Sequence, residues 1–125
     1  EALKVLQFLR RHWLERMPCP PLPELAVEEL KILCQRPGLL VVNKASGQAT
    51  ESILSRLATV LGPRAELSLA SRLDAPTSGV LPLAYGEAAG RHLQAQFAGR
   101  LVRKDYICLC EGPSLGETGS YAAID

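Results

Sequence analysis

Two charged side chains with the chemistry of an active site lie close together in the middle of the chain. Arg72 and Asp74 are separated by one residue, and a turn-forming cluster at residues 75–79 follows directly. Within it, Pro76 presets one backbone dihedral angle and Gly79 permits a positive φ, so we expect a sharp bend. A carboxylate at such a bend is held by the backbone and can face a cleft between two apolar segments.

Two interpretations of Asp74 stay open on residue types alone. In the first, the carboxylate caps a turn and Arg72 is a surface partner, because Asp before Pro and Gly is a common turn signal. In the second, Asp74 is a catalytic nucleophile or base that a nearby guanidinium orients and keeps ionised. The local sequence does not decide between them.

Short apolar segments separated by turn signals surround this bend. Residues 29–34 and Leu39–Lys44 are expected to form a hairpin, because the second run is apolar and β-branched. Residues 67–73 should form a strand that leads into the bend, and residues 80–85 a strand that leaves it. Pro82 inside that last run favours an edge strand or a bulge.

Two longer segments have the apolar spacing of helices. Thr50 is expected to cap a helix that runs to Leu61, with an acidic residue in its first turn. Residues 86–99 form the second pattern, with apolar residues at intervals of four and Gly99 at the expected C-cap.

The beginning of the chain has a different composition. Residues 1–17 read as an amphipathic helix, and the proline-rich residues 18–28 read as a linker. Residues 29–125 are then one domain. We expect an α+β fold, with a mixed, mostly antiparallel sheet, two packed helices and a separate N-terminal helix.

The overall composition is that of a globular protein. The chain has 125 residues, 47% of them hydrophobic and 22% charged, and a formal net charge of +1. This charge does not by itself indicate a nucleic-acid-binding protein, although the placement of charges matters more for phosphate contacts. The four cysteines lack metal-site spacing, so we expect no metal and a reducing compartment. No apolar run is long enough for a membrane span.

The segment around Asp74 resembles a known signature. Arg72-Leu73-Asp74-x-x-Thr77-Ser78-Gly79-Val80-Leu81-x-Leu83-Ala84 is similar to the motif of the RluA-like (RsuA/RluA) family of RNA pseudouridine synthases. The resemblance implies that Asp74 is the catalytic residue, that Arg72 orients it and that the Thr77-Ser78-Gly79 segment makes the turn. Ser71 stands where the family often has His, and a serine cannot stack on a base.

A second resemblance lies at the end of the first hairpin. Lys44-Ala45-Ser46-Gly47 is similar to the family pattern of a strand ending in Asn-Lys-Pro-x-Gly, with Ala45 in place of the proline. It makes Lys44 a candidate for an active-site or phosphate contact. A solvated lysine at a strand end is the alternative.

A third resemblance follows the second helix. The family has a helix ending in Gln-Phe and then a strand with a Lys-x-Tyr motif, to which Lys104-x-Tyr106 corresponds, and we expect this strand to continue to residue 111. The resemblance implies that Tyr106 stacks on the target base; a core tyrosine is the alternative. Arg100, Arg103 and Lys104 form the densest positive charge in the chain and suit RNA phosphates.

The implied reaction is the isomerisation of uridine to pseudouridine in RNA of the rRNA or tRNA class. It exchanges a C–N glycosidic bond for a C–C bond without a redox step, so no cofactor is expected. The resemblance covers roughly residues 30–112, and a later family motif with a basic partner for the catalytic Asp is missing. We therefore expect an incomplete synthase fold that is inactive by itself. The alternative is a catalytically inactive RNA-binding or interaction module that keeps the fold.

Overall fold

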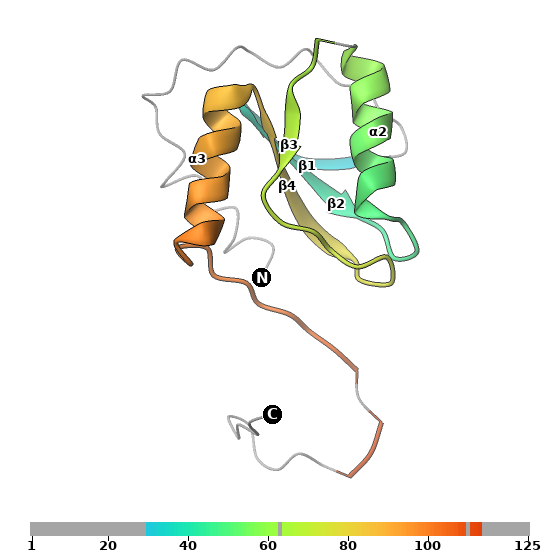
Figure 1. Cartoon of the computed structure of the whole chain (residues 1–125). Helices are drawn as coiled ribbons and strands as arrows, with labels where there is room; N and C mark the ends of the chain where they lie inside the picture. The colour runs from blue at the N-terminus through green and yellow to red at the C-terminus, as the bar shows by residue number, and fades with distance from the viewer. Residues whose placement is uncertain (1–29, 63, 110, 114–125) are drawn as a thin grey trace.

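The protein is built on one four-stranded sheet with two helices. The computed structural model describes residues 30–62, 64–109 and 111–113. The elements in chain order are β1 (Lys31–Arg36), β2 (Leu39–Lys44), α2 (Thr50–Leu61), β3 (Leu67–Leu69), β4 (Gly79–Tyr85) and α3 (Glu87–Ala98). All strand pairs are antiparallel, in the order β1-β2-β4-β3 (Figure 1). The expected α+β class is confirmed; the expected helix 1–17 and linker 18–28 lie outside the described residues.

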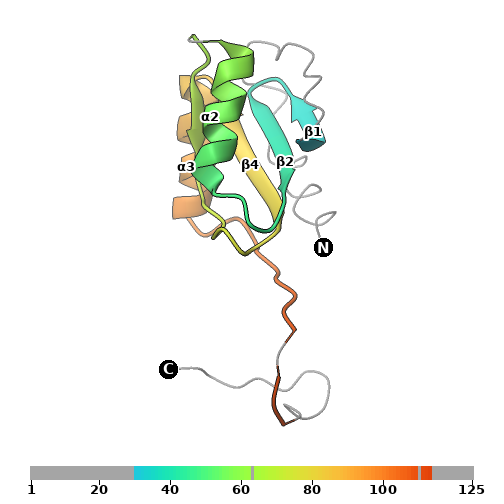
Figure 2. The same ribbon diagram turned by 90° about the vertical axis from the view of Figure 1, so that its right-hand side faces the viewer.

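The two helices cover opposite faces of the sheet. Successive side chains along β2 point to opposite faces, and so alternately toward α2 and α3. Leu40 and Val42 pack with α2 in one hydrophobic cluster, while Leu39 and Val41 pack with α3 in another. All four side chains are buried, and each contributes about 1.5–3 kcal/mol of hydrophobic stabilisation. The sheet is thus the central layer between α2 and α3 (Figure 1), and α2 lies in front of α3 in the view of Figure 2.

The helix boundaries follow the sequence closely, with one correction. α2 spans the expected residues, but its N-cap is Ala49, and the side chain of Thr50 does not cap it. α3 ends with Gly99 at the C-cap, as expected, yet the left-handed residue is Arg100, at a φ of 55°. The amide of Leu101 donates to the carbonyl of Gln96, which closes the helix end. Within the described residues, no helix has both the length and the apolar character needed to cross a membrane.

The strand that contains Pro82 is not an edge strand, which corrects the expectation. β4 lies between β2 and β3, but β3 ends at Leu69, which pairs with Leu83. The Tyr85 amide donates toward β2, to the carbonyl of Gly38. Because backbone amides alternate along a strand, the nitrogen of Pro82 faces the other side, beyond the end of β3. The proline therefore costs no ladder hydrogen bond, and β3 is shorter than the expected 67–73.

The expected strand that carries Lys104 and Tyr106 and continues to residue 111 is absent from the described residues, so this prediction was wrong. The segment after α3 is extended and leads away from the sheet (Figure 1). A strand needs a neighbour that receives its hydrogen bonds, and none of the four described strands pairs with this segment. Ile107 and Leu109 are accordingly 89% and 101% exposed.

Candidate active site

The sheet register brings two loops together at one end of the molecule. Lys44, the last residue of β2, pairs with Gly79, the first residue of β4. The loop after β2, residues 45–49, and the segment before β4, residues 70–78, therefore emerge at the same end of the sheet (Figure 1). Gly79 has a φ of 140°, which fits the expected role of a glycine at this bend.

Lys44 connects these two loops from within the protein. Its side chain is fully buried, and its ammonium donates hydrogen bonds to the carbonyl oxygens of Ala45, Gln48 and Ala75 at 3.1, 2.7 and 3.0 Å. An ammonium has three N–H donors, so this set uses its full capacity. A phosphate could reach this nitrogen only by displacing a carbonyl, and the geometry is that of an orienting residue.

Three further hydrogen-bonding residues join the same loops. The Thr50 hydroxyl donates to the Leu73 carbonyl at 2.7 Å and accepts from the Leu73 amide at 3.2 Å. The amide of Gly47 donates to the Ala75 carbonyl at 2.7 Å, and the Ser46 hydroxyl donates to the carbonyl of Pro76 at 2.8 Å. The segment 73–76 is therefore held by its backbone on both sides of Asp74.

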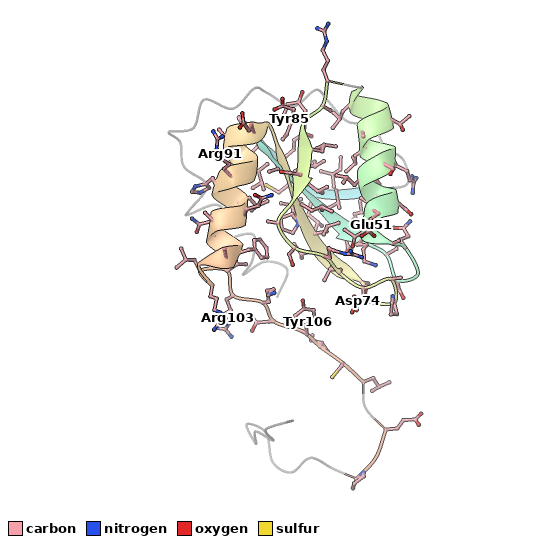
Figure 3. All side chains as sticks on the ribbon, viewed as in Figure 1. Glu51, Asp74, Tyr85, Arg91, Arg103 and Tyr106 are labelled. Atoms are coloured by element: carbon pink, nitrogen blue, oxygen red, sulfur yellow. The ribbon has the colours of Figure 1, made fainter. Side chains whose placement is uncertain are left out.

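Asp74 itself lies on a tight turn with an exposed side chain. Its carbonyl accepts a hydrogen bond from the Thr77 amide at 2.9 Å, which gives the expected bend. The ion pair that the structure shows for Arg72 is with Glu51, at 2.7 Å between Nη2 and Oε1, and both side chains are more than half exposed. Figure 3 shows Glu51, Asp74 and Tyr106 toward the lower end of the sheet.

A cavity of about 550 Å³ opens beside this turn. Its lining includes Leu73, Pro76 and Thr77 from the turn, and Lys104 and Tyr106 from the segment after α3. Tyr106 is 63% exposed, so its ring is available to a ligand. Asp74 is not among the lining residues, although residues on both sides of it are. The remaining lining residues are Ser71, Ser78, Gly79, Val80, Leu81, Pro82, Phe97, Val102, Asp105, Ile107 and Cys108.

The basic residues after α3 lie in the same part of the chain as Tyr106. Lys104 lies 5.9 Å from the centroid of the Phe97 ring, in a cation–π contact. Arg103 donates to Asp105 at 3.1 Å, and Arg100 is exposed at the end of α3. Arg100 and Lys104 are exposed to solvent, whereas Arg103 forms an ion pair with Asp105.

The roles of Thr50, Ser46 and Glu51 were not predicted from the sequence. Thr50 has the residue type and position of a helix cap, and its actual partner lies 23 positions away. The capping pattern at Thr50, with Glu51 beside it, predicted a hydrogen bond within the helix and not the bond to Leu73. Among the residues that the structure describes, no group of three or more His, Cys, Asp or Glu side chains is placed to hold a metal ion.

The chain has relatives among proteins of known function. It is 38% identical over 109 residues to a ribosomal large subunit pseudouridine synthase C of Vibrio cholerae, covering 78% of this chain and 34% of that protein. It is 38% identical over 84 residues to RNA pseudouridine synthase 1 of Arabidopsis thaliana (66% and 26%). It is 37% identical over 91 residues to a tRNA pseudouridine synthase C of Salmonella typhi (66% and 35%).

The chain thus spans about a third of the length of the curated relatives it matches. A family model described as RNA pseudouridylate synthase matches residues 31–123, which is most of the chain. This match includes β1, the loop of Lys44, the turn of Asp74 and the segment of Tyr106. The chain belongs to the RNA pseudouridylate synthase family, of the RluA type.

Proposed function

We propose that this protein isomerises uridine to pseudouridine in RNA and that Asp74 is the catalytic residue. One observation carries the proposal: the backbone of residues 73–76 is fixed by Lys44 and Thr50, both buried, while the Asp74 side chain stays exposed. A catalytic group must be held in place and still reach its substrate. A carboxylate that only capped a turn would not need a buried ammonium to anchor its backbone.

The proposed reaction needs one ionised carboxylate. The C1′–N1 bond of uridine breaks, C1′ bonds to C5, N1 takes up a proton and the hydrogen of C5 is released to solvent. Asp74 acts on the nucleoside as nucleophile or as base. Arg72 and Asp74 are two positions apart, so in an extended backbone their side chains lie on the same side. Arg72 would leave Glu51 and orient the carboxylate when RNA binds.

The cavity beside Asp74 suits a uridine that has left its stack. An exposed aromatic ring such as Tyr106 can stack on any base, and a flipped base in RNA is cheapest to extrude where the strand is unpaired. Thr77 would contact the same nucleoside from the turn. Arg100, Arg103 and Lys104 would bind phosphates, and the names of the relatives point to rRNA or tRNA as the class of RNA.

We further propose that the 125-residue chain is inactive when produced alone. Tyr106 lines the cavity from a segment that pairs with no described strand, and the next residue, Ile107, is 89% exposed. A segment without strand partners does not hold the Tyr106 ring in a fixed position at the cavity. Activity would therefore need additional residues that pack against this segment.

The test is tritium release from RNA labelled at C5 of uridine. It compares the complete translation product of the gene, its Asp74→Asn variant and the 125-residue chain. Glu87→Gln is the matched control, because Glu87 is an exposed acid at the start of α3. We expect release by the wild type and by Glu87→Gln, and none by Asp74→Asn or by the 125-residue chain. Full release by Asp74→Asn would remove Asp74 from the mechanism.

One observation favours a second candidate, an RNA-binding module without catalysis. Arg72 pairs with Glu51 in this structure and not with the carboxylate that it would orient. The same experiment decides between the two candidates when it is combined with an RNA-binding measurement. RNA binding by the complete translation product without tritium release would support the module.

A further inference from the structure

Thr50 has an arrangement that a helix-capping residue does not have. It is the first residue of α2 and is only 1% exposed, and its hydroxyl bonds to both backbone groups of Leu73. The Thr50 hydroxyl therefore both donates to and accepts from a single residue 23 positions away. This residue is the one that precedes Asp74.

The hydroxyl replaces a strand neighbour that Leu73 lacks. β3 ends at Leu69, so no ladder of this sheet reaches residue 73. A partly buried backbone N–H and C=O without partners would be costly, and the hydroxyl satisfies both groups at once. The Leu73 side chain also packs against the hydrophobic cluster under α2.

We propose that Thr50 is a positioning residue for Asp74, an inference that rests on the proposed function. The Leu73 carbonyl belongs to the peptide unit that carries the Asp74 nitrogen, so Thr50 fixes that unit. The next unit is fixed by the Thr77 amide, and the one after it by Lys44, through the Ala75 carbonyl. With three successive peptide units anchored, the Asp74 carboxylate moves by side-chain rotation alone.

The helix itself provides a matched control. Thr59 is in the same helix, and its hydroxyl donates to the Ser55 carbonyl at 3.0 Å on an exposed surface. Thr50→Val and Thr59→Val make the same chemical change, the loss of one hydroxyl, at a buried and an exposed position. Thr50→Ser keeps the hydroxyl and loses a methyl group, and Thr50→Ala serves where Thr50→Val does not fold.

The experiment measures two quantities in the complete translation product. The first is the hydrogen-exchange rate of the Leu73 amide, which reports the backbone contact without reference to activity. Thr50→Val should raise this rate by about tenfold or more, because a lost hydrogen bond of ordinary strength corresponds to that factor. Thr50→Ser and Thr59→Val should leave the rate near that of the wild type.

The second quantity is the rate of tritium release, separated into kcat and KM. Thr50→Val should lower kcat by about tenfold to a hundredfold with KM nearly unchanged, because a displaced catalytic group loses rate and not RNA affinity. Thr50→Ser should restore kcat. An unchanged Leu73 exchange rate or an unchanged kcat in Thr50→Val would overturn the proposal. If the wild type releases no tritium, the proposed function fails, and the exchange rate still decides whether Thr50 holds this backbone.

Discussion

The ammonium nitrogen of Lys44 lies 3.0 Å from the carbonyl oxygen of Ala75, across 31 positions of the sequence. The last residue of β2 therefore holds the backbone one residue beyond Asp74. Because Lys44 is fully buried, this contact belongs to the folded core as much as to the candidate active site. Stability and placement of the carboxylate are thus linked through one side chain.

Replacing Lys44 by Met should destabilise the fold. Met preserves much of the side-chain volume, but the carbonyls of Ala45 and Gln48 lose a buried donor. We expect the free energy of unfolding to fall by about 2 kcal/mol, the order of cost for buried groups left without partners. Urea denaturation measures this, with Lys31→Met as the control, since Lys31 is exposed on β1. Equal losses in both variants would contradict an anchoring role for Lys44.

Arg72 should matter for catalysis and little for stability. Its pair with Glu51 is exposed, and such pairs contribute about 0–1 kcal/mol, so Glu51→Gln should unfold at nearly the wild-type urea concentration. Arg72→Lys keeps the charge but loses the planar fork that holds a carboxylate in one orientation. We expect kcat for tritium release to fall by about tenfold or more in Arg72→Lys. Wild-type kcat in this variant would make Arg72 a surface residue.

The phenol ring of Tyr106 should act through stacking. Phe keeps the aromatic face, so Tyr106→Phe should retain RNA affinity, while Tyr106→Ala should weaken it by about 1–3 kcal/mol, the usual value of one base–aromatic stack. Because Tyr106 is 63% exposed, neither variant should change the free energy of unfolding appreciably. RNA titration and urea denaturation measure the two effects. A large loss of stability in Tyr106→Ala would instead identify a core tyrosine.

Glycine at position 100 should stabilise the protein. Arg100 has a φ of 55°, a left-handed conformation that costs a residue with a Cβ atom about 1–2 kcal/mol. Glycine removes this cost but loses more entropy on folding, so we expect a net gain of about 0.5–1 kcal/mol in the free energy of unfolding. Arg103→Gly, outside the left-handed region, is the control and should not stabilise. A less stable Arg100→Gly variant would contradict this explanation of the helix end.

Local patterns predicted most of the described elements. The apolar run Leu39–Lys44, the helix Thr50–Leu61 and the turn after Asp74 depend on residues within a few positions of one another, so their sequence contains the necessary information. The family signature singled out Asp74 and Tyr106 by the same kind of local order. The sheet register, in which Lys44 pairs with Gly79, brings the turn of Asp74 beside the cavity that Tyr106 lines.

The features that the sequence did not predict all depend on distant partners. The Thr50 hydroxyl bonds to a residue 23 positions away, and nothing near Thr50 distinguishes that bond from a helix cap. The expected strand after α3 had the right residue types but no described strand beside it. Pro82 tolerates a central strand because β3 ends early, a fact about another segment of the chain.

The most direct test of the central claim is a single-turnover measurement on Asp74→Asn in the complete translation product. RNA labelled with tritium at C5 of uridine is mixed with an excess of enzyme that saturates it, and binding of the same RNA to the same variant is measured in parallel. We predict RNA binding close to that of the wild type and no tritium release above background. Release at the wild-type rate, with binding intact, would contradict a catalytic role for Asp74.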